Sequence, residues 1–64
     1  MDKILSVIIP VYNEKKTILS VIEKVLLLEF VREVIVVDDG STDGTRAAID
    51  EAAARDARVR PVHL

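Results

Sequence analysis

The chain has 64 residues, with nine Lys and Arg, eleven Asp and Glu and one His, which gives a formal net charge of −2. A chain this short forms at most one small domain, and such a domain buries only about 60% of the surface that its unfolded form exposes. Half of the residues are apolar, two are aromatic and none is Cys. The core must therefore be aliphatic and without disulfides, and we expect the chain to be part of something larger. The mild acidity argues against nucleic acid as a partner.

The first predicted element is a strand over residues 5–11, a β-branched run that is too short for a helix and looks buried on both faces. Pro10 donates no ladder hydrogen bond, so we expect pairing to end there and a loop to follow. A helix is predicted over residues 15–28, because apolar residues recur there at helical spacing. That stripe consists of Ile18, Val21, Ile22, Val25 and Leu26. Residues 33–37 predict a second strand, again buried on both faces.

An acidic and hydroxylated segment, residues 38–45, leads into an Ala-rich helix that is predicted to run to about Asp56. Asp43 is its expected N-cap. The narrow apolar stripe of this helix consists of Ala48, Ile49, Ala52 and Ala53. Residues 59–64 predict a third short strand. The β-α-β-α-β order predicts an α/β fold with a parallel sheet, in which the second strand lies beside the first and the third outside it.

Polar side chains follow the first two strands of this predicted sheet. In a parallel sheet the carboxyl ends of the strands meet at one edge, where ligands bind, so the two loops should converge. Four carboxylates stand there with no Arg or His before Arg46, so a bare diphosphate would be repelled. The carboxylates would instead accept hydrogen bonds from a base or a ribose, or act through a divalent cation. The side chains expected at this edge are Tyr12, Asn13, Glu14, Asp38, Asp39, Ser41 and Asp43.

The second loop also matches part of a calcium-binding loop. The matching residues are Asp39, Ser41, Asp43, Gly44 and Asp50. The last ligand is Asp instead of the usual bidentate Glu, and a strand precedes the loop where a helix is usual. The competing interpretation is that Asp43 caps a helix and Gly44 makes a turn. The P-loop and the dinucleotide-binding glycine motif are both absent.

Two spaced motifs, residues 7–14 (VIIPVYNE) and residues 34–43 (VIVVDDGSTD), together resemble the start of a family 2 glycosyltransferase. They are most similar to the dolichyl-phosphate mannosyltransferase or undecaprenyl-phosphate sugar transferase branch. The resemblance implies a three-layer, Rossmann-like fold of the glycosyltransferase A type, of which residues 1–64 would be the first, incomplete, nucleotide-binding part. It implies transfer of a sugar from a UDP- or GDP-sugar to an acceptor such as a polyprenyl phosphate, with this chain inactive alone.

The same resemblance assigns roles to five residues. Pro10, Tyr12 and Glu14 would line the nucleoside pocket, and Asp39 would accept a hydrogen bond from the base, with Asp38 nearby. Structural alternatives are packing of the Tyr12 ring on a helix, a favourable position of Glu14 in the helix dipole, and turn formation by the two aspartates. The complete enzyme would need a divalent metal, Mg or Mn. Its ligands and the catalytic base lie further along such chains, so the sequence predicts no catalytic or metal-binding residue here.

A second class of function is a non-catalytic α/β module or a self-associating fragment. In the family fold the first strand is central, so a truncated chain would expose a hydrophobic strand edge of the kind that invites association. His63 is expected to be solvent-exposed or to fill the last strand.

The sequence offers no membrane-spanning segment. Its longest apolar stretches have about four residues, far below the 18 that such a helix needs. No cleavage site of a secretory signal follows the start. We therefore expect a cytoplasmic protein, placed at the cytoplasmic face of a membrane in its full-length form.

Overall fold

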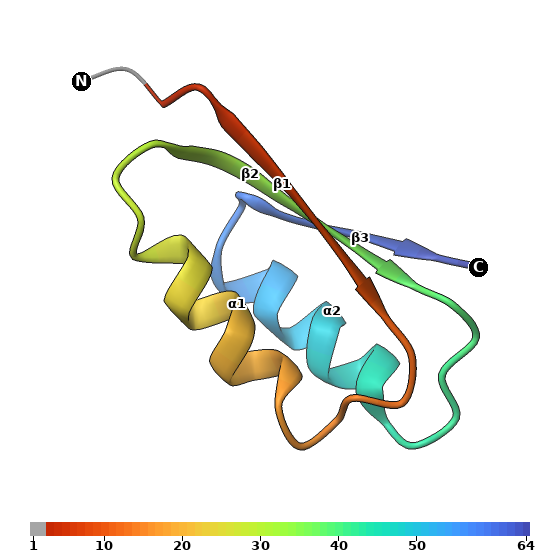
Figure 1. Cartoon of the computed structure of the whole chain (residues 1–64). Coiled ribbons are helices and arrows are strands. Elements are labelled where there is room, and N and C mark those ends of the chain that lie inside the picture. Colours follow the sequence, from red (N-terminus) through yellow and green to blue (C-terminus); the bar gives the residue numbers. More distant parts are fainter. Residues whose placement is uncertain (1–2) are drawn as a thin grey trace.

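The computed structural model describes residues 3–64 (Figure 1). Its elements are β1 (Leu5–Val11), α1 (Ile18–Leu26), β2 (Val31–Asp38), α2 (Thr45–Arg55) and β3 (Val59–His63). The three strands form one parallel sheet in the order β1-β2-β3. The predicted β-α-β-α-β unit, its parallel sheet and its strand order are confirmed.

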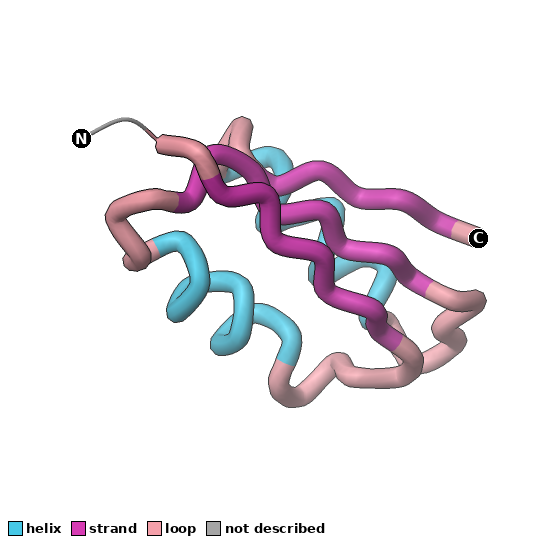
Figure 2. Tube along the Cα trace, turned by 45° about the horizontal axis from the view of Figure 1, so that its top comes forward, coloured by secondary structure: helices cyan, strands magenta, loops and turns pink. Residues whose placement is uncertain are grey.

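Both helices lie on the same face of the sheet (Figures 1 and 2). Two right-handed crossovers that step in the same direction across a sheet place their helices on one side. Val34 and Val36 are fully buried under the helices, whereas Ile8 on the opposite face is 65% exposed. The expectation that the first two strands are buried on both faces is therefore wrong for residues 3–64, which supply only two of the three layers.

The core lies between the sheet and the two helices and is aliphatic. Its buried members are Val11, Ile18, Ile22, Val31, Val34, Val36, Ile49, Ala52 and Val59. The small residues Ala48 and Ala53 pack against this core from α2, as the predicted stripe requires. The predicted stripe of α1 is confirmed apart from Val21, which is 40% exposed. Apolar burial on one side of the sheet thus holds the fold together.

The first helix is shorter than predicted. The residues before it form a turn in which the carbonyl of Glu14 accepts the N–H groups of Thr17 and Ile18, at 3.1 and 2.9 Å. At the other end, Leu27 and Leu28 donate to carbonyls three residues back, which tightens the last turn. Within the described residues, neither helix is long and apolar enough to cross a membrane.

Gly44, and not the predicted Asp43, is the N-cap of α2. Gly44 has a φ of 95°, a conformation that glycine adopts most readily, and a Cβ there would lie 3.3 Å from Cδ of Lys15. Asp43 still satisfies the start of the helix, because its Oδ1 accepts the backbone N–H of Thr45 at 3.0 Å and also the Thr45 hydroxyl. Asp43 therefore accepts a hydrogen bond at the start of the helix, as predicted, but the N-cap is Gly44, one residue later.

Pro10 lies inside β1 without interrupting the sheet. The N–H of Leu5 and the carbonyl of Val11 both bond toward β2, so the odd-numbered residues of β1 face their partner strand. The backbone groups of Pro10 point the other way, and its missing N–H falls on the outer edge of the sheet, where no bond is lost. Pairing consequently continues past Pro10 to Val11, which is the last residue of the predicted strand, and the expectation that pairing ends at Pro10 is wrong.

Replacing Ile49 with Val is expected to lower the free energy of unfolding by about 0.5–1.5 kcal/mol, because it leaves a gap in a packed core. Ile49 is fully buried, whereas Ile8 is mostly exposed. Ile8→Val is therefore the matched control and should change stability by less than about 0.5 kcal/mol. Urea unfolding followed by circular dichroism measures both. Equal losses at the two positions would contradict a core on one face of the sheet.

Candidate functional site

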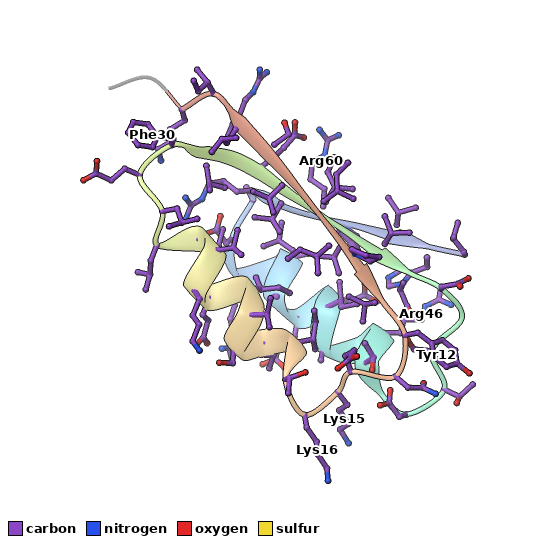
Figure 3. All side chains as sticks on the ribbon, in the orientation of Figure 1. Tyr12, Lys15, Lys16, Phe30, Arg46 and Arg60 are labelled. Atoms are coloured by element: carbon purple, nitrogen blue, oxygen red, sulfur yellow. The ribbon has the colours of Figure 1, made fainter. Side chains whose placement is uncertain are left out.

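The loop after β1 and the loop after β2 meet at one edge of the sheet. Val11 pairs with Asp38 at the last rung, and the carbonyl of Val11 accepts the N–H of Asp39 at 2.9 Å. Tyr12 and Asp39 are thus the first residues beyond two adjacent strand ends. Figure 3 shows Tyr12 at this end of the molecule and Phe30 at the other. The predicted convergence of the two loops is confirmed.

We call these loops, residues 12–17 and 39–44, the rim, and Asn13 clasps them together. The backbone N–H of Asn13 donates to Oγ of Ser41 at 2.9 Å, and Oδ1 of Asn13 accepts the N–H of Thr42 at 2.8 Å. Asn13 has a φ of 50°, in the left-handed region that Asn enters more readily than most residues. The sequence places Asn13 at this edge but suggests no role for it. An Asn directly after a strand is the signal that could have indicated the clasp.

Asp43 forms a second connection between the loops. Its Oδ2 accepts the N–H of Lys15 at 3.3 Å, while its Oδ1 serves Thr45. Hydrogen bonding from Thr45, ahead of that from Lys15, holds the pKa of Asp43 below its usual value. Asp43 is therefore ionised at neutral pH, and both of its oxygens are engaged within the protein.

The two adjacent aspartates have different surroundings. Asp38 is only 2% exposed; its Oδ1 accepts the N–H of Ser41 at 3.0 Å and its Oδ2 lies 3.2 Å from Nδ1 of His63. Hydrogen bonding from Ser41, and less from His63, outweighs desolvation and holds the pKa of Asp38 below its usual value. Asp39 is exposed, and its backbone is bonded to Val11. Asp38 thus shapes the turn, and Asp39 faces solvent from it.

The remaining predicted site residues lie on the β1 side of the rim. Tyr12 is 60% exposed, so its ring is not part of the core. Glu14 is exposed and accepts the hydroxyl of Thr17 at 3.1 Å. Pro10 and Glu14 help to line a hollow of about 160 Å³ between β1 and α1, which Tyr12 and Asp39 do not line. The structure therefore brings the five predicted residues to one end of the sheet without enclosing them in one pocket.

Cationic side chains also stand at this end, a feature that the sequence reasoning missed. Figure 3 shows Lys15 and Lys16 at the end of the molecule where Tyr12 lies, just before α1. The aliphatic stem of Lys15 passes over Gly44, so its ammonium group lies beside the second loop. The rim is therefore a mixed surface with an aromatic ring, carboxylates, hydroxyls and ammonium groups.

The sequence model of Glycosyl transferase family 2 matches residues 6–64, a range that contains both loops of the rim. The chain belongs to this family. The two motifs on which the resemblance rests, residues 7–14 and 34–43, lie within the matched range. A family 2 glycosyltransferase sequence thus forms the parallel unit described above, with its two motifs ending side by side.

Curated relatives carry transferase names. The glycosyltransferase GlyG of Streptococcus pneumoniae is 38% identical over 64 residues, which cover 98% of this chain and 21% of that protein. The undecaprenyl-phosphate 4-deoxy-4-formamido-L-arabinose transferase of Proteus mirabilis is 42% identical over 52 residues, 75% of this chain and 16% of that protein. The protein of the same name from Aeromonas hydrophila is 43% identical over 56 residues, which cover 81% of this chain and 17% of that protein. The chain spans about a fifth or less of these relatives. No solved structure matches it.

The residues of the predicted calcium loop serve other purposes in this family 2 unit. Asp43 bonds to Thr45 and Lys15, and Asp50 lies 2.7 Å from Nε2 of His63. Across residues 3–64, no group of three acidic, His or Cys side chains is arranged so that it could hold a metal ion. The structure therefore does not assemble a calcium site from this loop.

Replacing Asn13 with Ala is expected to loosen the clasp between the loops. The change removes the acceptor of the Thr42 N–H, and Ala disfavours the positive φ of this position. Hydrogen exchange at the Thr42 amide should accelerate about tenfold, as the loss of one hydrogen bond predicts. Asn13→Asp, which keeps an acceptor and the tolerance of positive φ, is the matched control and should preserve protection. An unchanged exchange rate in the Ala variant would show that the clasp does not order the second loop.

Proposed function

We propose that the chain is the nucleotide-recognition part of a family 2 glycosyltransferase that transfers a sugar from a UDP- or GDP-sugar to a polyprenyl phosphate or a similar acceptor. The observation that carries this proposal is the meeting of an exposed Tyr12 and an exposed Asp39 at adjacent strand ends. Family membership supports the transferase class. The names of the Proteus and Aeromonas relatives, which include undecaprenyl phosphate, support the acceptor class.

Each of the exposed groups suits a part of a nucleoside. The carboxylate of Asp39 accepts hydrogen bonds only, and the Watson–Crick edges of uracil and guanine both present N–H donors. The ring of Tyr12 provides a flat surface for stacking of the base. Glu14 and Pro10 flank the same end from β1, where a carboxylate can accept from ribose hydroxyls. Asp38 contributes by holding the turn that carries Asp39.

We further propose that residues 1–64 are the N-terminal part of a larger catalytic domain, without turnover of their own, that works at the cytoplasmic face of a membrane. The chain spans only a small share of each relative, which supports its being part of a larger domain. The described residues do not fit the Mg or Mn of a complete enzyme, because no three of their acidic, His or Cys side chains are arranged to hold a metal ion. We therefore derive no step through a metal ion.

Titration of the ¹⁵N-labelled chain with UDP-glucose and GDP-mannose, with and without Mn²⁺, tests nucleotide recognition. One of the two sugars should shift the amide resonances of Tyr12 and Asp39. Asp39→Ala, which removes the acceptor, and Tyr12→Leu, which removes the stacking surface, should each weaken binding about tenfold.

The matched control for this titration is Glu51→Gln. Glu51 is exposed on α2 and pairs with Arg55, so this variant should bind like the unaltered chain. The absence of any shift at the rim with both nucleotide sugars at millimolar concentration would overturn the proposal.

Self-association through β1 is a second candidate function, favoured by the exposure of this strand. Within the described residues no strand pairs with the outer edge of β1, where Ser6 and Ile8 direct their N–H groups, and Leu5 and Ile8 are exposed. Sedimentation velocity should show a mass that rises with concentration, and Ile8→Lys should reverse the rise. A monomer at every concentration, with a cooperative melt, would reject this candidate.

A further inference from the structure

His63 bridges carboxylates from two different elements. Its Nδ1 lies 3.2 Å from Oδ2 of Asp38 on β2, and its Nε2 lies 2.7 Å from Oδ1 of Asp50 on α2. The His63 side chain is 17% exposed. The expectation that this lone histidine is exposed or merely fills the strand is therefore wrong, since both ring nitrogens are engaged.

This geometry makes the two hydrogen bonds of the ring depend on which of its nitrogens carry a proton. An imidazole donates to two carboxylates at once only when both nitrogens carry a proton, and a neutral ring would turn a lone pair toward one of them. The titratable groups that face the ring are Asp38 from β2, which is buried, and Asp50 from α2, which is exposed. Arg46, one turn before Asp50 on α2, is a cation on the same helix face.

Asp38 connects the histidine to the rim. The carboxylate that meets His63 through Oδ2 holds the N–H of Ser41 through Oδ1, and Oγ of Ser41 in turn accepts the N–H of Asn13. Contact with His63 restricts rotation of the Asp38 carboxylate, and so fixes the oxygen that anchors the turn. Asp39 lies between Asp38 and Ser41, the two residues that this hydrogen bond joins.

We propose that His63 is a positioning residue for nucleotide recognition: its ring, held by Asp50, fixes Asp38 and thereby the turn that presents Asp39 to the base. His63 itself does not contact the nucleotide. This role predicts that the turn loosens and nucleotide binding weakens when the side chain at position 63 no longer donates to Asp38. The predicted effect on nucleotide affinity rests on the proposed function. The predicted effect on the turn does not.

Two substitutions separate the two nitrogens of the ring. In His63→Asn the amide donor lies near the position of Nδ1 and serves Asp38. In His63→Gln the donor lies near the position of Nε2 and serves Asp50 alone. Protection of the Ser41 amide and nucleotide affinity should be retained by His63→Asn, and both should fall about tenfold in His63→Gln. If His63 only fills space, the two variants should show similar protection of the Ser41 amide and similar nucleotide affinity.

A pH series supplies the second readout. In the unaltered chain, the Ser41 amide shift should follow protonation of the His63 ring, which is observed by its ¹⁵N resonances in the same series. Asp38 stays ionised around neutral pH, because its pKa is held below its usual value. His63→Asn should flatten the profile. Asp50→Asn, at an exposed helix position that leaves the core intact, should weaken the pH dependence of the Ser41 amide shift.

The failure of this inference differs from the failure of the proposed function. A Ser41 amide that ignores ring protonation, or equal behaviour of the Asn and Gln variants, would overturn the positioning role of His63. If neither nucleotide sugar binds, the proposed function fails, while the Ser41 readout without nucleotide still decides the role of His63. If a His63 variant loses spectral dispersion, Asp50→Asn and the pH series of the unaltered chain decide it.

Discussion

The pairing of Val11 with Asp38 is the constraint on which the candidate site depends. Because β1 and β2 are parallel and end at the same rung, the loops that follow them start side by side. Side chains alternate between the faces of a strand, so a slip of one residue would move Asp38 out from under the helices and place its neighbour there instead. The buried Asp38 and the exposed Asp39 are thus two consequences of one register.

The same register divides the uncovered face of the sheet into two halves. At the strand starts, Glu33 accepts the Ser6 hydroxyl at 2.6 Å and an Arg60 guanidinium N–H at 3.2 Å, and the Ser6 hydrogen bond is the main reason why the pKa of Glu33 is lowered. From the rung that Ile8 shares with Ile35 and Arg60 onward, the face also carries apolar side chains, and Ile8 and Val62 are exposed there. A polar network stabilises one half in water, while nothing in residues 3–64 covers the other half.

Features with a local cause were predictable from the sequence, as was the meeting of loops that parallel strands impose, whereas individual side-chain contacts between distant elements were not. The stripe around Ile18 and Ile22 shows its helical period within a few residues, so that helix and its buried face were found. A continuous apolar strand does not reveal whether one or two layers cover it, so the exposure of Ile8 was missed. The bridge made by His63 depends on the meeting of three elements, none of which shows it alone.

Several polar side chains of the rim bond to the protein itself, and the others remain free to meet a ligand. Asn13 and Asp38 engage the second loop, so the backbone around Asp39 is ordered before anything binds. Loops that are already fixed lose less conformational entropy when a ligand arrives, and affinity then depends more directly on the groups left exposed. The groups left exposed at this rim include a flat ring and a carboxylate, the pair that a base with an N–H edge can use at once.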